Sequence, residues 1–357
     1  MKVRLGDICE INMGQSPDSC SYNVEKDGIP FYQGNADFGE RFPAPRVWCN
    51  APSKIANPGD ILISVRAPIG ALNYAQEKCC IGRGLAAITP DSSKSSSDFI
   101  FWMLKGKRAE LTSKGTGSTF KAIGRKILEE TLVPDLSLEE QLICATNLEK
   151  IYAVIQKRKQ QLQLLDTLIK GRFVEMFGDI IHNDCNWPVF LFSDITTSRL
   201  GKMLDAKQQT GCHKYPYLAN FNVQWFHFEL NTLNEMDFNK ADQVEFALRD
   251  GDLLVCEGGE IGRCAVWHNN LKECYFQKAL HRVRCNEKMV VPDFLAWWFK
   301  FNCDNGGFAS IEGAKATISH LTGAKLKNLQ VPIPPLALQQ QFADFVQQVD
   351  KSLFCGI

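Results

Sequence analysis

The sequence contains nearly the same octapeptide twice, DFIFWMLK at residues 98–105 and DFLAWWFK at residues 293–300. Alone, an apolar run that begins with Asp and ends with Lys could be an ordinary buried helix, because Asp is a good N-cap and Lys suits a helix C-terminus. Four more pairs match in the same order: LGDI (5–8) with FSDI (192–195), IPFYQGN (29–35) with YPYLANF (215–221), PGDILISVRAPIG (58–70) with DGDLLVCEGGEIG (250–262), and VPDLSLEEQ (133–141) with IPPLALQQQ (333–341). Because these segments differ in character but keep their order, the matches identify an internal duplication.

Each copy is long enough to be a domain with its own core. The repeat is far longer than the roughly 20 to 50 residues of solenoid and propeller repeats. A chain of 357 residues with 45% apolar and 10% aromatic residues can form two cores, since domains usually hold roughly 100 to 200 residues. No uncharged apolar run of about 18 residues is present, and the stretch MKVRLGDICE lacks the apolar segment of a signal peptide. A cytoplasmic protein is expected.

The cysteine spacing predicts no metal site, and the charge balance does not indicate a strongly basic protein. The 14 cysteines include no C-x-x-C pair, and the six histidines show no metal-ligand spacing, so buried, reduced thiols are predicted and no metal site. Forty basic residues balance forty acidic ones, which counts against an autonomous nucleic-acid binder. Two local basic segments, residues 104–115 and 312–328, are interpreted as a solvated helix face and a polar loop.

A long helix is predicted between the two copies. Residues 136–178 contain no Pro, and no Gly before Gly171, while Ser137 and Glu140 form a capping box. About forty helical residues would span about 60 Å. A second amphipathic helix is predicted after the second copy, at residues 334–352, with Leu338, Phe342, Phe345 and Val349 on its apolar face. The apolar seam of the first helix consists of Leu148, Ile151, Ile155, Leu162, Leu165 and Ile169, with Arg158 as the one polar member. A single helix cannot bury this seam alone.

Several of these segments together resemble the DNA-specificity (S) subunit of type I restriction-modification systems. They are RFVEMFGD at residues 172–179, the segment at 334–352, and the paired strands GDILIS and GDLLVC. The resemblance implies a mixed α/β fold: two duplicated target recognition domains with pseudo-twofold symmetry, separated by long antiparallel coiled-coil helices. The domains implied are recognition domain 1 (1–135), a central spacer helix (136–178), recognition domain 2 (179–335) and a shortened distal helix (336–357).

The resemblance also implies a function and partners. Each recognition domain would read one half of a bipartite site in double-stranded DNA. The helices would set the unread gap and dock methyltransferase (M) subunits, and a restriction/translocase (R) subunit would join through the complex. S-adenosylmethionine, ATP and Mg would be used by those partner subunits, and the chain itself would bind no cofactor and catalyse no reaction. Because family members continue the distal helix further, a truncated or silent specificity cassette that does not assemble stays open as an alternative.

A self-contained methyltransferase or nuclease is the less favoured alternative. The sequence has no NPPY, NPPF, DPPY or DPPF motif, and no G-x-x-x-x-G-K-[ST] loop for ATP. The glycines of GGEIG at residues 258–262 are interpreted as a turn, since the first copy has RAPIG there. Asp252, Glu257 and Glu260 are interpreted as surface or turn carboxylates rather than a nuclease cluster.

Candidate DNA-contacting residues follow from side-chain chemistry and from the family's use of loops for base reading. Arg suits guanine, Asn and Gln suit adenine, and Glu suits cytosine, whereas Lys and hydroxyl groups suit phosphates. Tyr32, Tyr217 and the octapeptide tryptophans are predicted to be scaffold. The candidates are Gln33, Asn35, Arg66, Lys114, Ser118 and Lys121 in the first copy, and Asn220, Asn222, Glu257, Lys278, Lys315 and Thr317 in the second.

Overall fold

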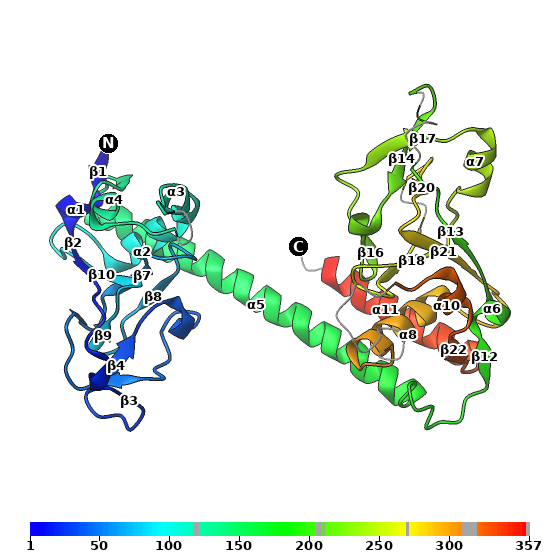
Figure 1. Ribbon diagram of the computed structural model, residues 1–357, viewed down its shortest axis with the longest axis horizontal. Helices are drawn as coiled ribbons and strands as arrows, with labels where there is room; N and C mark the ends of the chain where they lie inside the picture. The colour runs from blue at the N-terminus through cyan, green and yellow to red at the C-terminus, as the bar shows by residue number, and fades with distance from the viewer. Residues whose placement is uncertain (118–120, 205–208, 210, 269–270, 309–319, 355–357) are drawn as a thin grey trace. The chain divides into compact units, whose positions relative to one another are not determined.

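The computed structural model describes residues 1–117, 121–204, 209, 211–268, 271–308 and 320–354 (Figure 1). The chain divides into two compact units, Met1–Lys159 (unit 1) and Gln160–Ile357 (unit 2). Both units combine sheets with helices, which confirms the predicted mixed α/β class. Among the described helices, none is long and apolar enough to cross a membrane.

Unit 1 is built on a four-stranded antiparallel sheet. Its elements are β1 (Lys2–Arg4), α1 (Leu5–Ile8), β2 (Cys9–Met13), η1 (Ser19–Ser21), β3 (Tyr22–Asn23), β4 (Ile29–Tyr32), η2 (Asn35–Asp37), β5 (Trp48–Cys49), β6 (Ile55–Ala56), β7 (Ile61–Ser64), β8 (Leu72–Tyr74), β9 (Cys79–Ile81), β10 (Leu85–Pro90), α2 (Ser97–Gly106), α3 (Arg108–Ser113), α4 (Arg125–Glu129), β11 (Leu132–Pro134) and the first part of α5 (Leu138–Phe177). The central sheet has the order β2-β10-β7-β8. A second sheet, β3-β5-β4-β9-β6, includes one parallel pair, β4 with β9, and β1 pairs with β11.

Unit 2 repeats this plan. Its elements after α5 are β12 (Val189–Leu191), α6 (Phe192–Ile195), β13 (Thr196–Leu200), β14 (Lys214–Leu218), η4 (Asn220–Asn222), β15 (Val223–Gln224), β16 (His227–Phe228), β17 (Asn234–Asp237), α7 (Lys240–Glu245), β18 (Leu253–Cys256), β19 (Cys264–Val266), β20 (Tyr275–Phe276), β21 (Leu280–Cys285), α8 (Pro292–Asp304), α10 (Gly323–Lys327), β22 (Gln330–Pro332) and α11 (Leu336–Phe354). Its central sheet, β13-β21-β18-β19, matches β2-β10-β7-β8 strand for strand. The β12–β22 pair matches β1–β11, and the parallel pair of β14 and β20 matches β4 and β9.

The repeated octapeptides form equivalent helices, α2 after β10 and α8 after β21. Their apolar residues enter the two cores because Phe99, Trp102, Phe294 and Trp297 are all buried. Tyr32 and Tyr217 are buried as well, so the scaffold prediction for these aromatic residues is confirmed. The duplication read from the sequence is therefore a duplication of structure.

The two long helices begin in the same way. At the start of α5, the predicted capping box is confirmed: the backbone N–H of Glu140 donates to Ser137 Oγ at 3.3 Å, and the N–H of Ser137 to Glu140 Oε2 at 2.8 Å. Directly after Glu140, the buried side chain of Gln141 accepts from the N–H of Ser96 at 2.9 Å and donates to the carbonyl oxygen of Lys94 at 3.0 Å. These bonds fix the helix to the turn before α2.

Gln339 does the same at the start of α11. Its buried side chain accepts from the N–H of Val291 at 2.9 Å and donates to the carbonyl oxygen of Met289 at 3.0 Å, in the turn before α8. We call the pair Gln141 and Gln339 the glutamine clamps. Each clamp satisfies backbone groups that would otherwise be buried without a partner.

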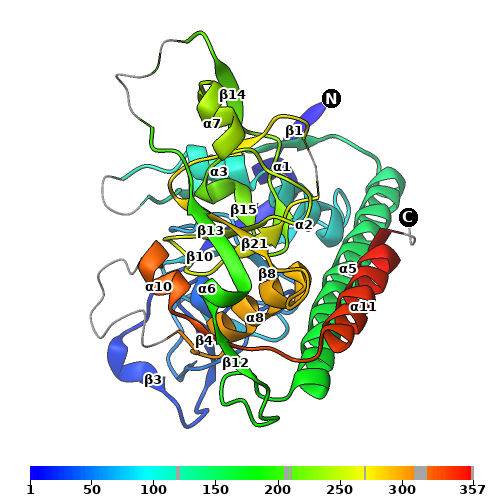
Figure 2. The same ribbon diagram turned by 90° about the vertical axis from the view of Figure 1, so that its right-hand side faces the viewer.

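Within unit 2, α11 packs on the last part of α5, and Figure 2 shows the two helices side by side. Phe342 contacts both Phe173 (ring centroids 5.3 Å apart) and Phe177 (5.5 Å), whereas Val349 lines the same cavity as the earlier residue Ile169. Residue numbers thus rise along one helix as they fall along the other, so the helices are antiparallel as predicted. Further along the predicted seam of α5, Ile151, Ile155 and Leu162 are 56%, 46% and 46% exposed.

The thiols and the basic segments fit most of their predictions. All described cysteines are free, and most are buried, but Cys20, Cys185 and Cys212 are exposed. Burial raises the pKa of the Cys79 thiol to about 12. No group of three or more His, Cys, Asp or Glu in the described part of the chain could hold a metal ion. In the first basic segment Lys107 and Lys114 both pair with Glu110, as expected of a solvated helix face, whereas much of the second lies outside the described residues.

The glutamine clamps yield a reciprocal prediction. Gln141→Ala should lower the free energy of opening of unit 1 by about 2 kcal/mol, because buried backbone groups lose their partners, and Gln339→Ala should do the same to unit 2. Hydrogen exchange measured by mass spectrometry resolves the two units. Gln163→Ala, at an exposed position on α5, is the control. Equal acceleration of exchange in both units by either variant would contradict the assignment of one clamp to each unit.

Candidate functional site

In unit 1, several loops meet at one end of the central sheet and are joined by backbone hydrogen bonds. The N–H of Gly84 donates to the carbonyl oxygen of Gln33 at 3.1 Å, and the N–H of Val65 to that of Gly84 at 2.9 Å. The N–H of Ala67 donates to the carbonyl oxygen of Lys121 at 3.1 Å. We call this group loop cluster 1, comprising residues 14–16, 33–35, 65–68, 82–84 and 121–123.

Unit 2 repeats the same bonds. The N–H of Glu257 donates to the carbonyl oxygen of Ala279 at 3.0 Å, as Val65 does to Gly84, and the N–H of Gln277 donates to that of Leu218 at 3.1 Å, as Gly82 does to Tyr32 at 2.8 Å. The N–H of Leu321 donates to the backbone carbonyl oxygen of Glu257 at 2.7 Å, as the N–H of Ile123 does to that of Val65 at 2.9 Å. Loop cluster 2 comprises residues 201–203, 219–222, 257–260, 277–279 and 320–322.

Glycine at one equivalent position of the two clusters permits this close approach. A Cβ on Gly14 would lie 2.2 Å from the carbonyl oxygen of Gly82, and a Cβ on Gly201 would lie 2.3 Å from that of Gln277. Both are backbone atoms, so neither clash can be relieved by a rotamer change. Gly14 and Gly201 also occupy equivalent positions, since their N–H groups donate to Leu85 and to Leu280 at the starts of β10 and β21.

Loop cluster 1 brings together four of the predicted contact residues. Gln33, Arg66 and Lys121 are exposed, and Asn35 opens the short helix η2 beside Gln33. Lys114 lies at the end of α3, where its ammonium pairs with Glu110 at 2.6 Å. Hydrogen bonds from Lys107 and Lys114 lower the pKa of Glu110 to about 2. Lys114 thus stabilises its own helix, and Ser118 lies outside the described residues.

Of the predicted DNA-contacting residues in loop cluster 2, some are accessible to solvent and others support the loops. Lys278 is exposed and Glu257 is half-buried. Asn220 holds the neighbouring loop, since its Nδ2 donates to the carbonyl oxygen of Gly258 at 2.9 Å. Asn222 is only 1% exposed, and its Nδ2 donates to the carbonyl oxygens of Glu229 and Thr232, both at 2.9 Å. The prediction that Asn222 faces a ligand is corrected here, because both amide donors serve the loop. Lys315 and Thr317 lie outside the described residues.

Arg83 was not among the predicted residues, although the structure puts it in cluster 1. It is exposed between Gly82 and Gly84, at the position that corresponds to Lys278 in unit 2. No side-chain partner of Arg83 occurs among the described residues. The sequence held a signal for it, since aligning LAAITP (85–90) with LHRVRC (280–285) sets Arg83 opposite Lys278.

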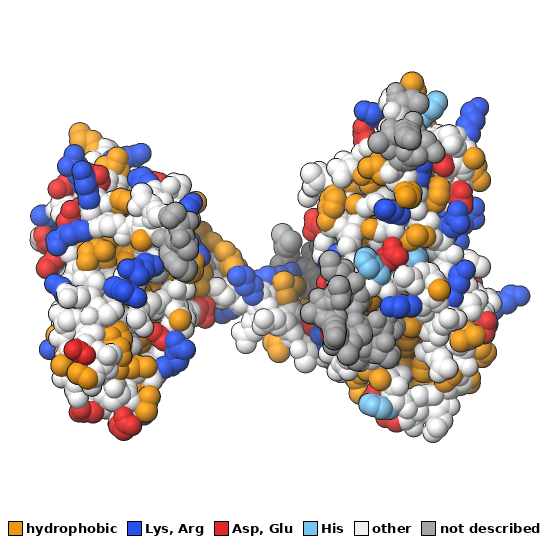
Figure 3. Space-filling model, viewed as in Figure 1, with side chains coloured by type: hydrophobic (Ala, Val, Ile, Leu, Met, Phe, Trp, Pro, Cys, Tyr) orange, Lys and Arg blue, Asp and Glu red, His pale blue; other side chains and the backbone are white. Residues whose placement is uncertain are grey.

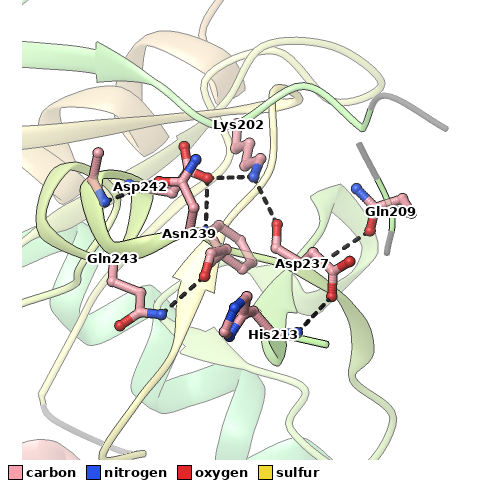
Figure 4. Close-up of polar contacts among 9 residues, drawn as sticks. Lys202, Gln209, His213, Asp237, Asn239, Asp242 and Gln243 are labelled. Atoms are coloured by element: carbon pink, nitrogen blue, oxygen red, sulfur yellow. Dashed lines mark hydrogen bonds and ion pairs between the residues drawn. The ribbon is translucent and has the colours of Figure 1, made fainter. Parts of the chain in front are cut away.

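A partly buried lysine, Lys202, anchors loop cluster 2 to β17 and α7 (Figure 4). The ammonium of Lys202 donates to Asp242 Oδ2 at 2.5 Å and to the carbonyl oxygen of Asp237 at 2.6 Å. The carboxylate of Asp237 accepts from the N–H groups of Gly211 at 2.6 Å and His213 at 3.0 Å. Unit 1 has Gln15 at the position of Lys202, so this charged anchor belongs to unit 2 alone.

Two of the three acidic residues considered for a nuclease, Asp252 and Glu260, have structural partners. Asp252 is 2% exposed, closes a turn by accepting from the N–H of Arg249 at 2.8 Å, and pairs with Arg284 at 2.7 Å. Glu260 accepts from the indole N–H of Trp225 at 2.5 Å. The turn interpretation is confirmed for Asp252, which is buried rather than at the surface.

On the visible face of unit 1, Lys and Arg side chains are interspersed with Asp and Glu instead of forming one patch (Figure 3).

Comparisons with known proteins agree on one family. The model for the type I restriction modification DNA specificity domain matches residues 1–165 and 185–354. A Methanocaldococcus jannaschii protein provisionally assigned as the MjaX type I restriction enzyme specificity subunit is 46% identical over 165 residues, which span 45% of this chain and 39% of that protein. The EcoBI type I restriction enzyme specificity subunit of Escherichia coli is 20% identical over 98% of this chain and 79% of its own length.

A solved structure shares the fold across the chain. The S subunit of a type I restriction-modification system from M. genitalium superposes with a TM-score of 0.60, covering 99% of this chain and 90% of that one at 13% sequence identity. At this identity the likeness concerns the fold alone. The chain spans 39% of the length of the MjaX relative, the one with 46% identity.

The two crowded glycines provide a test of the loop clusters. Gly14→Ala and Gly201→Ala should each separate the loops of their own cluster, because the new Cβ overlaps a carbonyl oxygen. We expect a loss of about 2 kcal/mol in the free energy of opening of the affected unit, seen as faster hydrogen exchange in its cluster. Gly34→Ala is the matched control, since a Cβ there has no neighbour within 4 Å. Normal exchange in both clashing variants would show that the loops are not held together by this contact.

Proposed function

The chain belongs to the family of type I restriction modification DNA specificity domains, and on that premise we propose that it is the sequence-recognition subunit of such a system. Each loop cluster reads one half of a bipartite site in double-stranded DNA. The observation that carries this proposal is the duplicated loop frame: the same backbone bonds support different exposed side chains in the two units. Two unlike readers on one frame are what a site with two unlike halves requires.

The exposed side chains of the clusters fit contacts to DNA. In unit 1 the guanidinium of Arg66 suits a guanine edge and the amide of Gln33 suits an adenine edge. Arg83, Lys121 and Lys278 are exposed cations suited to phosphates. The balanced charge of the whole chain means that these few cations, rather than a general basic surface, provide the attraction.

The partners follow from the exposed part of the α5 seam. Ile151, Ile155 and Leu162 are about half exposed, and burying a Leu or Ile side chain is worth roughly 1.5 to 3 kcal/mol. We assign this stripe to the docking of methyltransferase subunits, with α5 setting the length of the unread gap. In this proposal a restriction/translocase subunit joins through the complex, and S-adenosylmethionine, ATP and Mg serve the partner subunits.

Exchange of one recognition domain tests the proposal. Replacing residues 1–135 with the corresponding domain of a relative should change one half of the methylated sequence and leave the other half and the gap unchanged. The reciprocal exchange of residues 179–335 should change only the other half. Methylation mapping by long-read sequencing, with the chain co-expressed with its methyltransferase subunit, gives the readout. Changes in both halves after a single exchange would refute independent reading.

Arg83 and Lys278 are expected to contact phosphates. Arg83→Ala and Lys278→Ala should weaken DNA binding about equally for all sequences, and each should reduce the slope of log affinity against log salt by about 0.9. Lys94→Ala and Lys288→Ala are charge-matched controls, because these exposed lysines follow β10 and β21 at the opposite end of each sheet. A change of preferred base in the Arg83 or Lys278 variant would assign that side chain to base reading.

A further inference from the structure

The duplicated units differ in how they fill the space beside the octapeptide helix. In unit 1 the ring of Tyr74 stacks on Phe101, with centroids 4.5 Å apart, and its hydroxyl donates to Asp98 Oδ1 at 2.8 Å. The guanidinium of Arg41 lies 4.8 Å from the centroid of Phe101 and pairs with Glu149. Unit 1 therefore fills this space with two rings and a cation from its own chain.

Unit 2 has small residues at the corresponding positions. Pairing of β18 with β19 sets Val266 opposite Leu253, as pairing of β7 with β8 sets Tyr74 opposite Ile61, so Val266 replaces Tyr74. The octapeptides set Ala296 at the position of Phe101. Two aromatic rings are thus missing, whereas the neighbouring Asp and Trp are kept, as Asp293 and Trp297 in place of Asp98 and Trp102.

A cavity of about 310 Å³ lies where those rings would be. Its volume is at the small end of the range for ligand pockets. All of its lining residues belong to unit 2, and α5, β19, α8 and α11 contribute Leu165, Val266, Asp293, Ala296, Trp297 and Val349 among others. We call it the Asp293 cavity.

The carboxylate of Asp293 lacks the phenol donor that its counterpart Asp98 has in Tyr74. Asp98 accepts from the Tyr74 hydroxyl, but valine at position 266 has no hydrogen to donate. Among the described residues, this carboxylate accepts from the backbone N–H of Asp293 itself and interacts electrostatically with His268, which also lines the cavity. Burial raises the pKa of Asp293 because it disfavours the charged carboxylate. A cation beside the carboxylate would act in the opposite direction and favour the charged form. A second carboxylate, Asp166, lies on the cavity lining and pairs with Lys170 at 3.0 Å.

A strained residue forms one wall of the cavity. Phe226 has a φ of 64°, a left-handed conformation that is strained for a residue other than glycine. Its N–H donates to the carbonyl oxygen of Cys264 at 3.0 Å, and its ring stacks on Trp297 at 4.3 Å. This bond and the stacking hold the strained residue in place, so the cavity has an aromatic wall next to its carboxylates.

We propose that the Asp293 cavity binds an organic cation, namely a guanidinium carried on an apolar stem. The apolar lining suits the stem, and a planar guanidinium can form two hydrogen bonds with a carboxylate such as Asp293. Unit 1 provides the internal precedent, because its own Arg41 guanidinium occupies the equivalent region. The cation has two possible sources with the same chemistry, a free small molecule or an arginine side chain of a partner chain. This site is independent of DNA reading.

The test uses the purified full-length chain and two probes, agmatine for the free molecule and N-acetylarginine amide for the side chain. Binding is followed by calorimetry and by tryptophan fluorescence. We expect at least one probe to bind, and the neutral analogue butylurea to bind at least about tenfold more weakly, because a hydrogen bond to a charged group is worth more than a neutral one. Asp293→Asn should weaken probe binding about tenfold or more.

Val266→Tyr should abolish binding, since it restores the ring and the hydroxyl that unit 1 has. Asp98→Asn in unit 1 is the matched control and should leave binding unchanged. Binding of agmatine alone assigns the cavity to a small molecule, and binding of the blocked arginine alone assigns it to a partner chain. The proposal is overturned if neither probe binds at concentrations up to about 10 mM, or if Asp293→Asn and Val266→Tyr, folded as judged by circular dichroism, bind as the parent does.

Discussion

The hydrogen bonds between loop backbones at the end of each central sheet are the constraint on which the candidate site depends. A loop that is partly buried must satisfy its N–H and C=O groups, and here the loops satisfy one another. The bond from Val65 to Gly84 recurs as the bond from Glu257 to Ala279, although none of these residue types is shared. Because the frame uses backbone atoms, exposed side chains can change without weakening it. Such a frame suits a recognition module whose surface differs between copies.

The glutamine clamps extend the same logic to the helices. A helix N-terminus leaves backbone donors without partners, and the preceding turn has its own unpaired groups. One buried amide side chain serves both needs, since it can donate and accept at once. Gln141 and Gln339 therefore tie each long helix to the turn before its own octapeptide helix. The duplicated unit is best regarded as a sheet, its covering helix and the start of a long helix, held together as one piece.

The sequence was informative wherever the signal is periodic or repeated. The forty residues of α5, its capping box and the buried aromatic residues of α2 and α8 follow from spacing and from the duplication. The fate of a single polar side chain did not follow. Asn222 and Gln33 looked alike as polar loop residues, yet one is buried with both donors bonded and the other is exposed. That difference depends on which loops fold over them, which is a long-range property. Gly14 is a similar case, because its need for a missing Cβ comes from Gly82, far away in sequence.

Divergence between the units has followed the physical cost of change. The turn before the core strand keeps its carboxylate, as Asp60 and Asp252, but its partner is the hydroxyl of Thr89 at 2.7 Å in one unit and the guanidinium of Arg284 at 2.7 Å in the other. A buried carboxylate must be satisfied, yet a hydroxyl and a guanidinium both satisfy it. Beside the cavity, Asp293 has stayed while its phenol donor has gone, and it keeps only its own backbone N–H and an electrostatic interaction with His268 among the described residues. A half-buried carboxylate with few partners, at the edge of an apolar cavity, is suited to a cation from outside the chain. This is the physical reason for expecting the cavity to be occupied.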